Sequence, residues 1–191
     1  MEGISLDDFL AGDFISEDAK VIGIAGGSGS GKSYIARQIA DKIGARILTV
    51  EEYITPKTIT PASNWDLPEC WDLRLLDENL GDFLKGKGFE KPVYGFKTGV
   101  IDRYETVESG GRILVEGLYS LYGFLADHID CSIFVDAPAD VRLARVVKRD
   151  FVERSGHNEA KITKRWNGTV QPAYLGYVEP QKEKADLIII N

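Results

Sequence analysis

The sequence predicts an α/β protein whose central sheet is parallel and carries helices on both faces. Short apolar runs of strand length alternate with longer segments in which apolar residues recur every three or four positions. This alternation is typical of parallel strands joined by crossover helices. The first run, residues 21–25, ends in a glycine-rich loop, as expected for a buried central strand. The 191 residues suffice for one compact domain with a large core.

Two parts of the chain differ in character. Residues 1–20 form an acidic segment, in which residues 4–10 are expected to make a short helix packed outside the main fold. Residues 21–191 are expected to form a single domain, because no internal repeat or low-complexity tract interrupts them.

The elements of this domain follow from their patterns. A helix is expected from residue 32 to about residue 43, because Gly44 supplies a C-terminal stop. Apolar periodicity and the enrichment of β-formers predict the others. They are a strand at residues 46–50, a helix at 68–84, a hairpin at 91–107, buried strands at 113–115 and 132–135, a helix at 139–154 and a last strand at 187–190.

The loop after the first strand matches the phosphate-binding motif GxxxxGK[ST] in full. Its residues are Gly26, Gly27, Ser28, Gly29, Ser30, Gly31, Lys32 and Ser33. The glycines let successive N–H groups face phosphate oxygens, and the next helix adds its N-terminal partial charge. Lys32 can then reach the β- and γ-phosphates of ATP, and Ser33 can ligate Mg²⁺. A ligand-free glycine turn is the alternative, but the strand-loop-helix context favours a P-loop NTPase three-layer fold.

Two acidic residues follow predicted strands. Glu51 comes after residues 46–50, and Glu116 after residues 113–115. Ligands of open α/β sheets gather at the carboxyl ends of the strands, where carboxylates can bind Mg²⁺ or take a proton from a hydroxyl. We therefore expect Glu116 in the metal shell and Glu51 as base or second metal ligand. Glu52 could replace Glu51, and both acids could instead be surface caps.

The later helix is unusually rich in arginine. Basic residues on a helix above a phosphate site can neutralise transition-state charge and exclude water on closing, so this helix is a candidate lid. Two or three of the arginines are expected to act on ligands and the others to be structural, while a solvated charged face is the alternative. They are Arg142, Arg145, Arg149 and Arg154.

Composition narrows the setting and the partners. The net charge of −7 argues against a broad nucleic-acid surface. No apolar run reaches the length of a membrane span, and the N-terminus lacks the pattern of a secretory signal, so a cytoplasmic protein is expected. Cys70 and Cys131 lie far apart and form no CxxC pair, which makes a disulfide framework or zinc site unexpected.

Beyond the P-loop, the chain resembles the uridine kinase/phosphoribulokinase family of P-loop kinases over residues 21–190. The resemblance implies ATP-dependent 5′-phosphorylation of a nucleoside with Mg²⁺ near Ser33 and Glu116, and Asp66 bonded to ribose hydroxyls. It also implies Glu51 in the catalytic acid position and Arg149, with Arg145 and Arg154, on acceptor and phosphates. Members often assemble as oligomers, so a homo-oligomer is an open alternative. The matching segments are residues 51–54, 64–72, 115–117, 134–143, 149–154, 170–174 and 185–189.

The hairpin departs from the family pattern. Nucleoside kinases of this family carry Pro-x-Tyr-Asp-Phe and, three residues later, a histidine that helps to read the base. Here Tyr94 and Phe96 are kept as substrate-binding candidates, whereas Gly95 stands for the aspartate and Gly99 for the histidine. Glu51 likewise stands for the family's aspartate. Losing a hydrogen-bond reader weakens discrimination, so the acceptor stays open.

Three functions compete. The first is a nucleoside kinase. The second is a sister kinase for a sugar, sugar phosphate, pantothenate or glycerate, with Lys91, Lys97 and Arg103 as cations for a phosphorylated acceptor. The third is a nucleotide-binding regulatory protein without phosphotransfer.

Overall fold

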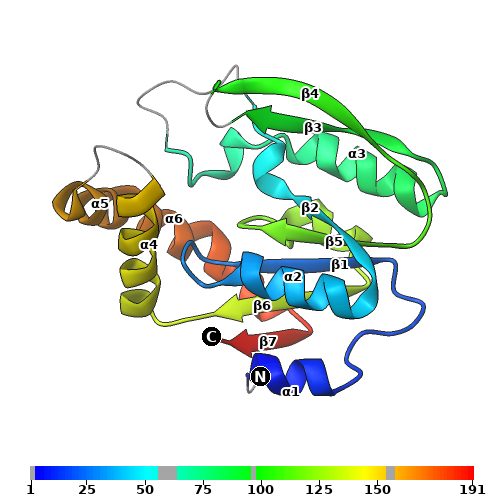
Figure 1. Ribbon diagram of the computed structural model, residues 1–191, viewed down its shortest axis with the longest axis horizontal. Helices are drawn as coiled ribbons and strands as arrows, with labels where there is room; N and C mark the ends of the chain where they lie inside the picture. The colour runs from blue at the N-terminus through cyan, green and yellow to red at the C-terminus, as the bar shows by residue number, and fades with distance from the viewer. Residues whose placement is uncertain (1–2, 56–63, 96–97, 154–157) are drawn as a thin grey trace.

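The computed structural model describes residues 3–55, 64–95, 98–153 and 158–191. Its centre is a five-stranded parallel sheet in the order β2-β5-β1-β6-β7, which confirms the predicted fold class (Figure 1). The carboxyl ends of the strands all point to the side where helix α4 begins. The strands are β1 (Val21–Gly26), β2 (Ala45–Thr49), β5 (Arg112–Gly117), β6 (Cys131–Asp136) and β7 (Leu187–Ile190).

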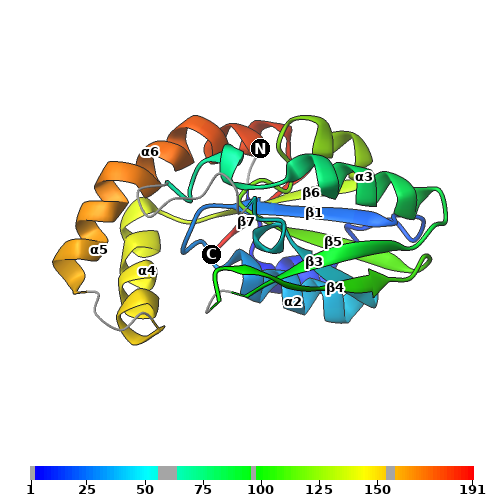
Figure 2. The same ribbon diagram turned by 90° about the horizontal axis from the view of Figure 1, so that it is seen from above.

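The central strand, β1, divides the core into two layers. All six of its residues are buried, and their side chains alternate between the two faces. Val21 and Ala25 pack in one hydrophobic cluster, and Ile22 and Ile24 pack in the other. Figure 2 shows the helices that cover these faces, with α2 below the sheet and α3 and α6 above it.

Helix α2 (Lys32–Ile43) begins at the P-loop and ends at Gly44, as predicted. Helix α3 (Leu73–Leu84) begins later than the predicted residue 68. Before it lie a 3₁₀ turn and Trp71, which is held extended by a β-bridge to Ile54. The Asp72 carboxylate then accepts a hydrogen bond of 3.0 Å from the Leu75 N–H and caps the helix. Apolar spacing runs through this turn, so periodicity alone placed the helix start too early.

The predicted hairpin is present as β3 (Phe89–Gly95) and β4 (Val100–Val107), paired antiparallel. Its register shifts between Val93 and Tyr94, so a bulge lies next to the candidate substrate-binding tyrosine. Bulges re-aim the side chains beside them.

The N-terminal segment is docked on the sheet and not outside the main fold. Ile4 pairs in parallel with Ile189 of β7, and its N–H donates to the Ile188 carbonyl at 2.9 Å. Helix α1 (Leu6–Ala11) follows, and its Phe9 is buried in the cluster that contains α2. Pairing and burial together cover the edge that β7 would otherwise expose.

Helices α4 (Ala139–Glu153) and α5 (Glu159–Arg165) project from the sheet as an arm, called the α4–α5 arm below (Figure 2). Helical turns continue after α5 through α6 (Gln171–Ala173) to residue 184, and two of these turns are π-type. Periodicity predicts no helix in these residues, because glycines and prolines interrupt the apolar pattern and wide turns shift its period. No helix within the described residues is long and apolar enough to cross a membrane.

Candidate active site

The P-loop joins β1 to α2 with a backbone that depends on two glycines. Gly29 and Gly31 have φ angles of 79° and 92°, in the left-handed region that other residues rarely adopt. A Cβ at Gly29 would also overlap the Arg142 carbonyl. The loop therefore has the conformation and close packing that the motif predicts, with the N-terminus of α2 directly after it.

Two arginines of α4 pack against the P-loop. Arg145 Nη1 lies 3.4 Å and 3.3 Å from the carbonyl oxygens of Gly29 and Ser30. Arg142 is 2% exposed, and its guanidinium lies 3.8 Å from the Tyr174 ring centroid. Arg142 is thus one of the structural arginines, while Arg145 contacts the candidate nucleotide loop itself. Both place positive charge at the loop.

Lys32 faces Glu51 across the site. Its Nζ lies 3.9 Å from Glu51 Oε1. The other carboxylate oxygen of Glu51 is buried and accepts no hydrogen bond from the described residues. Burial raises the pKa of Glu51, the charge of Lys32 opposes that rise, and the charge of Glu116 adds to it. This carboxylate therefore has a raised proton affinity and an oxygen without a protein donor.

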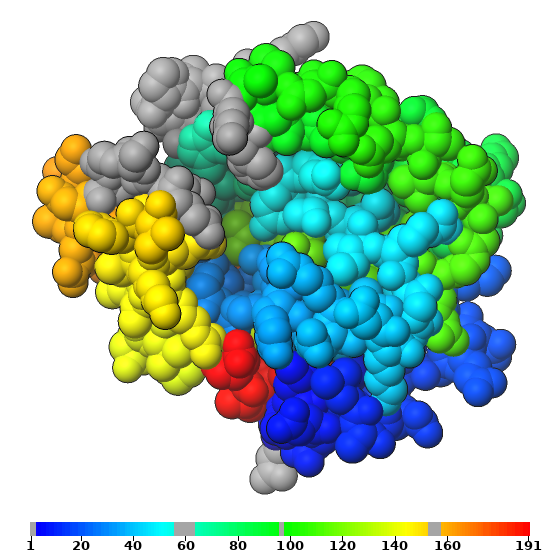
Figure 3. Space-filling view, in the orientation of Figure 1, coloured from blue at the N-terminus to red at the C-terminus, as the bar shows by residue number. Residues whose placement is uncertain are grey.

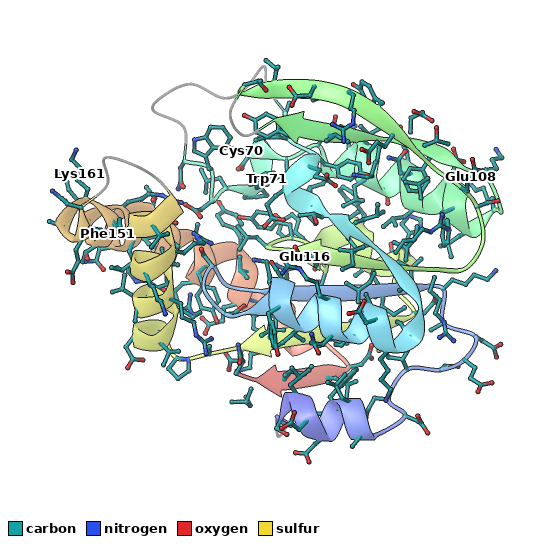
Figure 4. All side chains as sticks on the ribbon, in the orientation of Figure 1. Cys70, Trp71, Glu108, Glu116, Phe151 and Lys161 are labelled. Carbon is teal, nitrogen blue, oxygen red and sulfur yellow. The ribbon has the colours of Figure 1, made fainter. Side chains whose placement is uncertain are left out.

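Ser33 and Glu116 form a second pair beside the first. Glu116 is 6% exposed and lies near the end of β5, in register with Ile24 of β1 and Thr49 of β2. Ser33 Oγ donates to Glu116 Oε2 at 3.2 Å. Figure 4 shows Glu116 near the centre of the molecule, above α2. Both acids that follow predicted strands therefore lie at the P-loop.

These oxygen atoms fit Mg²⁺ in type and in number. The described residues contain no group of three or more His, Cys, Asp or Glu side chains that could hold a metal. Magnesium is normally bound by one or two carboxylates together with phosphates and water. The hydroxyl of Ser33, the carboxylate of Glu116 and the unpartnered oxygen of Glu51 match that donor set.

Asp66 is the residue expected to bind the acceptor. As a whole residue it is 6% exposed, and it lines a small cavity together with Ser28 of the P-loop. The Tyr119 hydroxyl donates to the Asp66 backbone carbonyl, and the Asp66 N–H donates to Asn64 Oδ1 at 3.1 Å. The candidate acceptor residue is thus fixed from two sides. Leu118, Val170, Ala173, Tyr174 and Val178 complete the cavity.

Arg165 was missed by sequence reasoning, although it contacts Asp66. Its Nη2 donates to Asp66 Oδ2 at 3.2 Å, and its Nη1 lies 3.5 Å from Asp150 Oδ2. Asp150 also pairs with Arg149, at 2.9 Å. Arg149, which was expected to bind phosphate and acceptor, is therefore ion-paired within the arm. Nothing in spacing or motif links Arg165 to a residue 99 positions earlier.

The hairpin candidates lie apart from that cavity. Tyr94 is 8% exposed, packs in a core cluster, and is not among the described residues that line the cavity. A Cβ at Gly95 would overlap the carboxylate of Asp102 on the facing strand. Asp102 therefore fills the space where the family's aspartate would begin. The other two candidates, Phe96 and Arg154, fall outside the described residues.

Two of the three cations proposed for a phosphorylated acceptor are already paired. Lys91 Nζ lies 2.8 Å from Glu52 Oε2 and 3.5 Å from Glu105 Oε2. Arg103 Nη2 lies 2.5 Å from Glu105 Oε1. The third, Lys97, falls outside the described residues. Glu52 consequently faces the hairpin, which leaves Glu51 as the acid at the P-loop.

The sequence matches the Phosphoribulokinase / Uridine kinase family over residues 21–191. A uridine kinase of Lactobacillus helveticus (strain DPC 4571) is 35% identical over 185 residues, which cover 91% of this chain and 87% of the relative. A uridine kinase of Halobacterium salinarum (strain ATCC 700922 / JCM 11081 / NRC-1) is 35% identical over 178 residues, which cover 88% of this chain and 78% of the relative.

Solved structures share the fold. A putative fructose transport system kinase from Silicibacter sp. TM1040 superposes with a TM-score of 0.70 at 17% identity, and the match covers 98% of this chain and 99% of that one. A possible uridine kinase from Bacillus stearothermophilus superposes with a TM-score of 0.63 at 17% identity, covering 96% and 94%. At such low identity these likenesses concern the fold alone.

Proposed function

The chain belongs to the phosphoribulokinase/uridine kinase family, and from this premise we propose that it transfers the γ-phosphoryl group of ATP to the 5′-hydroxyl of a ribonucleoside such as uridine or cytidine. One observation carries the proposal. Lys32 and Ser33 of the P-loop meet two carboxylates, Glu51 at 3.9 Å and Glu116 at 3.2 Å, while Asp66 shares a cavity with Ser28. The residues proposed to bind phosphate therefore adjoin the carboxylate proposed to bind the acceptor.

The phosphate end would be held by the backbone N–H groups of the P-loop and by Lys32. Ser33 and Glu116 are the residues that would hold Mg²⁺, joined by Glu51 if that carboxylate is not the base; the ion neutralises charge on the β- and γ-phosphates when bound. Lys32 stabilises the negative charge that spreads over the γ-phosphoryl oxygens in the transition state. To reach those oxygens, its ammonium group would move away from the Glu51 carboxylate.

Transfer requires one bond to form and one to break. The acceptor oxygen attacks the γ-phosphorus in line, the bond to the β,γ-bridging oxygen breaks, and ADP leaves. The hydroxyl proton passes to Glu51, whose pKa is raised by burial and by Glu116. A carboxylate with a raised pKa is a better proton acceptor near neutral pH. If Glu51 instead completes the metal shell, the same position lets it orient the hydroxyl.

The charges around the acceptor side favour an uncharged acceptor over a sugar phosphate. Lys91, Arg103, Arg149 and Arg165 each pair with a carboxylate. A phosphate group on the acceptor would have to displace a carboxylate in order to bind any of these four described cations. An uncharged nucleoside requires no such displacement, because the Asp66 carboxylate can accept hydrogen bonds from ribose hydroxyls.

A coupled ADP-release assay tests the proposal. Purified protein is given Mg·ATP and, in parallel, uridine, cytidine, adenosine, guanosine, ribose, ribulose 5-phosphate, pantothenate and glycerate. We expect turnover with at least one pyrimidine ribonucleoside and a 5′-monophosphate product identified by mass spectrometry. Turnover with another alcohol only would identify a sister kinase. ATP binding without any acceptor-dependent ADP release would favour the regulatory alternative.

A further inference from the structure

Arg165 joins the arm to the acceptor side through a chain of charges. Asp66, Arg165, Asp150 and Arg149 alternate in sign and lie 3.2, 3.5 and 2.9 Å apart in that order. The first belongs to the loop before α3, and the others belong to the α4–α5 arm. Figure 3 shows the arm at the left of this face and the hairpin at its upper right.

The two carboxylates in this series of charges, Asp66 and Asp150, have different surroundings. The Asp150 side chain is 1% exposed and pairs with two arginines, which suits a residue that holds the arm together. The Asp66 side chain is 9% exposed and borders the cavity at Ser28. Arg165 lies between them with 35% of its side chain exposed. A ligand can therefore reach the Arg165 guanidinium without unburying either acid.

Guanidinium chemistry gives Arg165 capacity beyond these two contacts. The group carries five N–H donors in one plane, and the contacts with Asp66 and Asp150 need only two. Beside it, the carboxylate of Asp66 has two oxygens with about four acceptor positions. A donor group thus stands 3.2 Å from an acceptor group, Asp66, that lines the cavity.

We propose that Arg165 is an acceptor-binding residue that, with Asp66, holds two neighbouring hydroxyls of the acceptor. Each hydroxyl both donates and accepts, so one can donate to Asp66 while an oxygen of the pair accepts from Arg165. This inference rests on the proposed function and names the vicinal diol of the nucleoside ribose as the group that Arg165 reads. The positive charge of Arg165 also compensates the buried charge of Asp66.

The test combines enzyme variants with substrate analogues. Wild type and Arg165→Gln are assayed with uridine, 2′-deoxyuridine and 3′-deoxyuridine, or with the matching cytidine set if cytidine is preferred. Lys164→Gln removes the same charge one residue earlier, at an exposed position, and is the matched control. Thermal unfolding is followed for each protein, and Arg165→Lys, which keeps the charge, replaces Arg165→Gln if the latter does not fold.

For Arg165→Gln we expect kcat/KM for the ribonucleoside to fall by about 10- to 100-fold through a raised acceptor KM. The KM for ATP should stay within about twofold of wild type, and Lys164→Gln should match wild type in both. The loss caused by removing one ribose hydroxyl should shrink in the variant, because its partner has gone. An unchanged hydroxyl penalty in Arg165→Gln overturns the inference. Wild type that turns over no ribonucleoside instead overturns the proposed function, and this inference with it.

Discussion

The phosphate side and the acceptor side of this site are built in different ways. The P-loop is one run of residues, 26–33, whose geometry follows from local backbone preferences and from the strand and helix that flank it. The acceptor side joins Asp66 to Arg165, which are 99 residues apart, and its cavity also takes residues from the helical turns after α5. A local motif fixes where phosphate binds, whereas only the tertiary fold fixes what faces it.

The two sides also differ in charge balance. Lys32 has one carboxylate near it, at 3.9 Å, and the loop and helix N-terminus add further positive potential. On the acceptor side, Arg165 and Lys91 each lie close to two carboxylates. Of these three cations, Lys32 thus has the longest carboxylate contact, and it lies where the triphosphate would bind. This asymmetry separates a charged donor from an uncharged acceptor.

Lys32→Ala should have the largest effect, because it removes the cation that the P-loop itself provides. We expect kcat to fall by about 10³-fold or more, since a preorganised charge in a site that excludes water contributes strongly to transition-state stabilisation. The melting temperature should change little, because Lys32 is ion-paired only loosely, at 3.9 Å. Lys85→Ala, at an exposed helix end, is the control. Near-normal turnover by Lys32→Ala would remove the basis of the phosphate-site assignment.

Glu116→Gln should have the next largest effect and should act through magnesium. The amide keeps the size of the side chain and one oxygen, but loses the charge that favours a divalent cation. We expect the Mg²⁺ concentration for half-maximal activity to rise by about 10-fold or more. Titration of activity with Mg²⁺ at fixed ATP measures this shift. The same Mg²⁺ dependence in variant and wild type would exclude Glu116 from the metal shell.

Sequence reasoning succeeded where structure is local. The P-loop, the course of α2 to Gly44, and the placing of Glu51 and Glu116 at strand ends all depend on motif and on the rule that parallel strands end at one edge. The resemblance supplied Asp66 as an acceptor residue, and the structure sets it at the cavity beside Ser28.

Sequence reasoning failed where distant segments decide the outcome. Trp71 is extended because it pairs with Ile54, and α3 therefore begins later in the sequence than predicted. Burial of Phe9 and pairing of Ile4 attach the N-terminal segment to the sheet, and neither contact has a local signal. Arg165 belongs to the same class, since its partner is far away in the chain. These misses share one cause, namely contacts between segments that no spacing rule relates.

The smallest effect should come from the ion pair that ties the hairpin to the acid-bearing turn. Glu52 follows Glu51 in the 3₁₀ turn Val50–Glu52, and its carboxylate binds Lys91 of β3 at 2.8 Å. Lys91→Met keeps the aliphatic stem and removes the charge. We expect a loss of about 1 kcal/mol in the free energy of unfolding, because the pair is largely but not fully buried. Turnover should fall by only about threefold, through poorer placement of Glu51.

A double-mutant cycle separates this ion pair from general damage to the hairpin. Lys91→Met, Glu52→Gln and the double variant are compared by chemical denaturation and by kcat, and the two single losses should not add, because each removes the same contact. Glu105→Gln is the matched control, since Glu105 contacts the same Lys91 Nζ at 3.5 Å from a more exposed position. Its effect should be close to zero. Additive losses in the cycle would mean that Lys91 and Glu52 are energetically independent, and that this contact does not couple the hairpin to the acid-bearing turn.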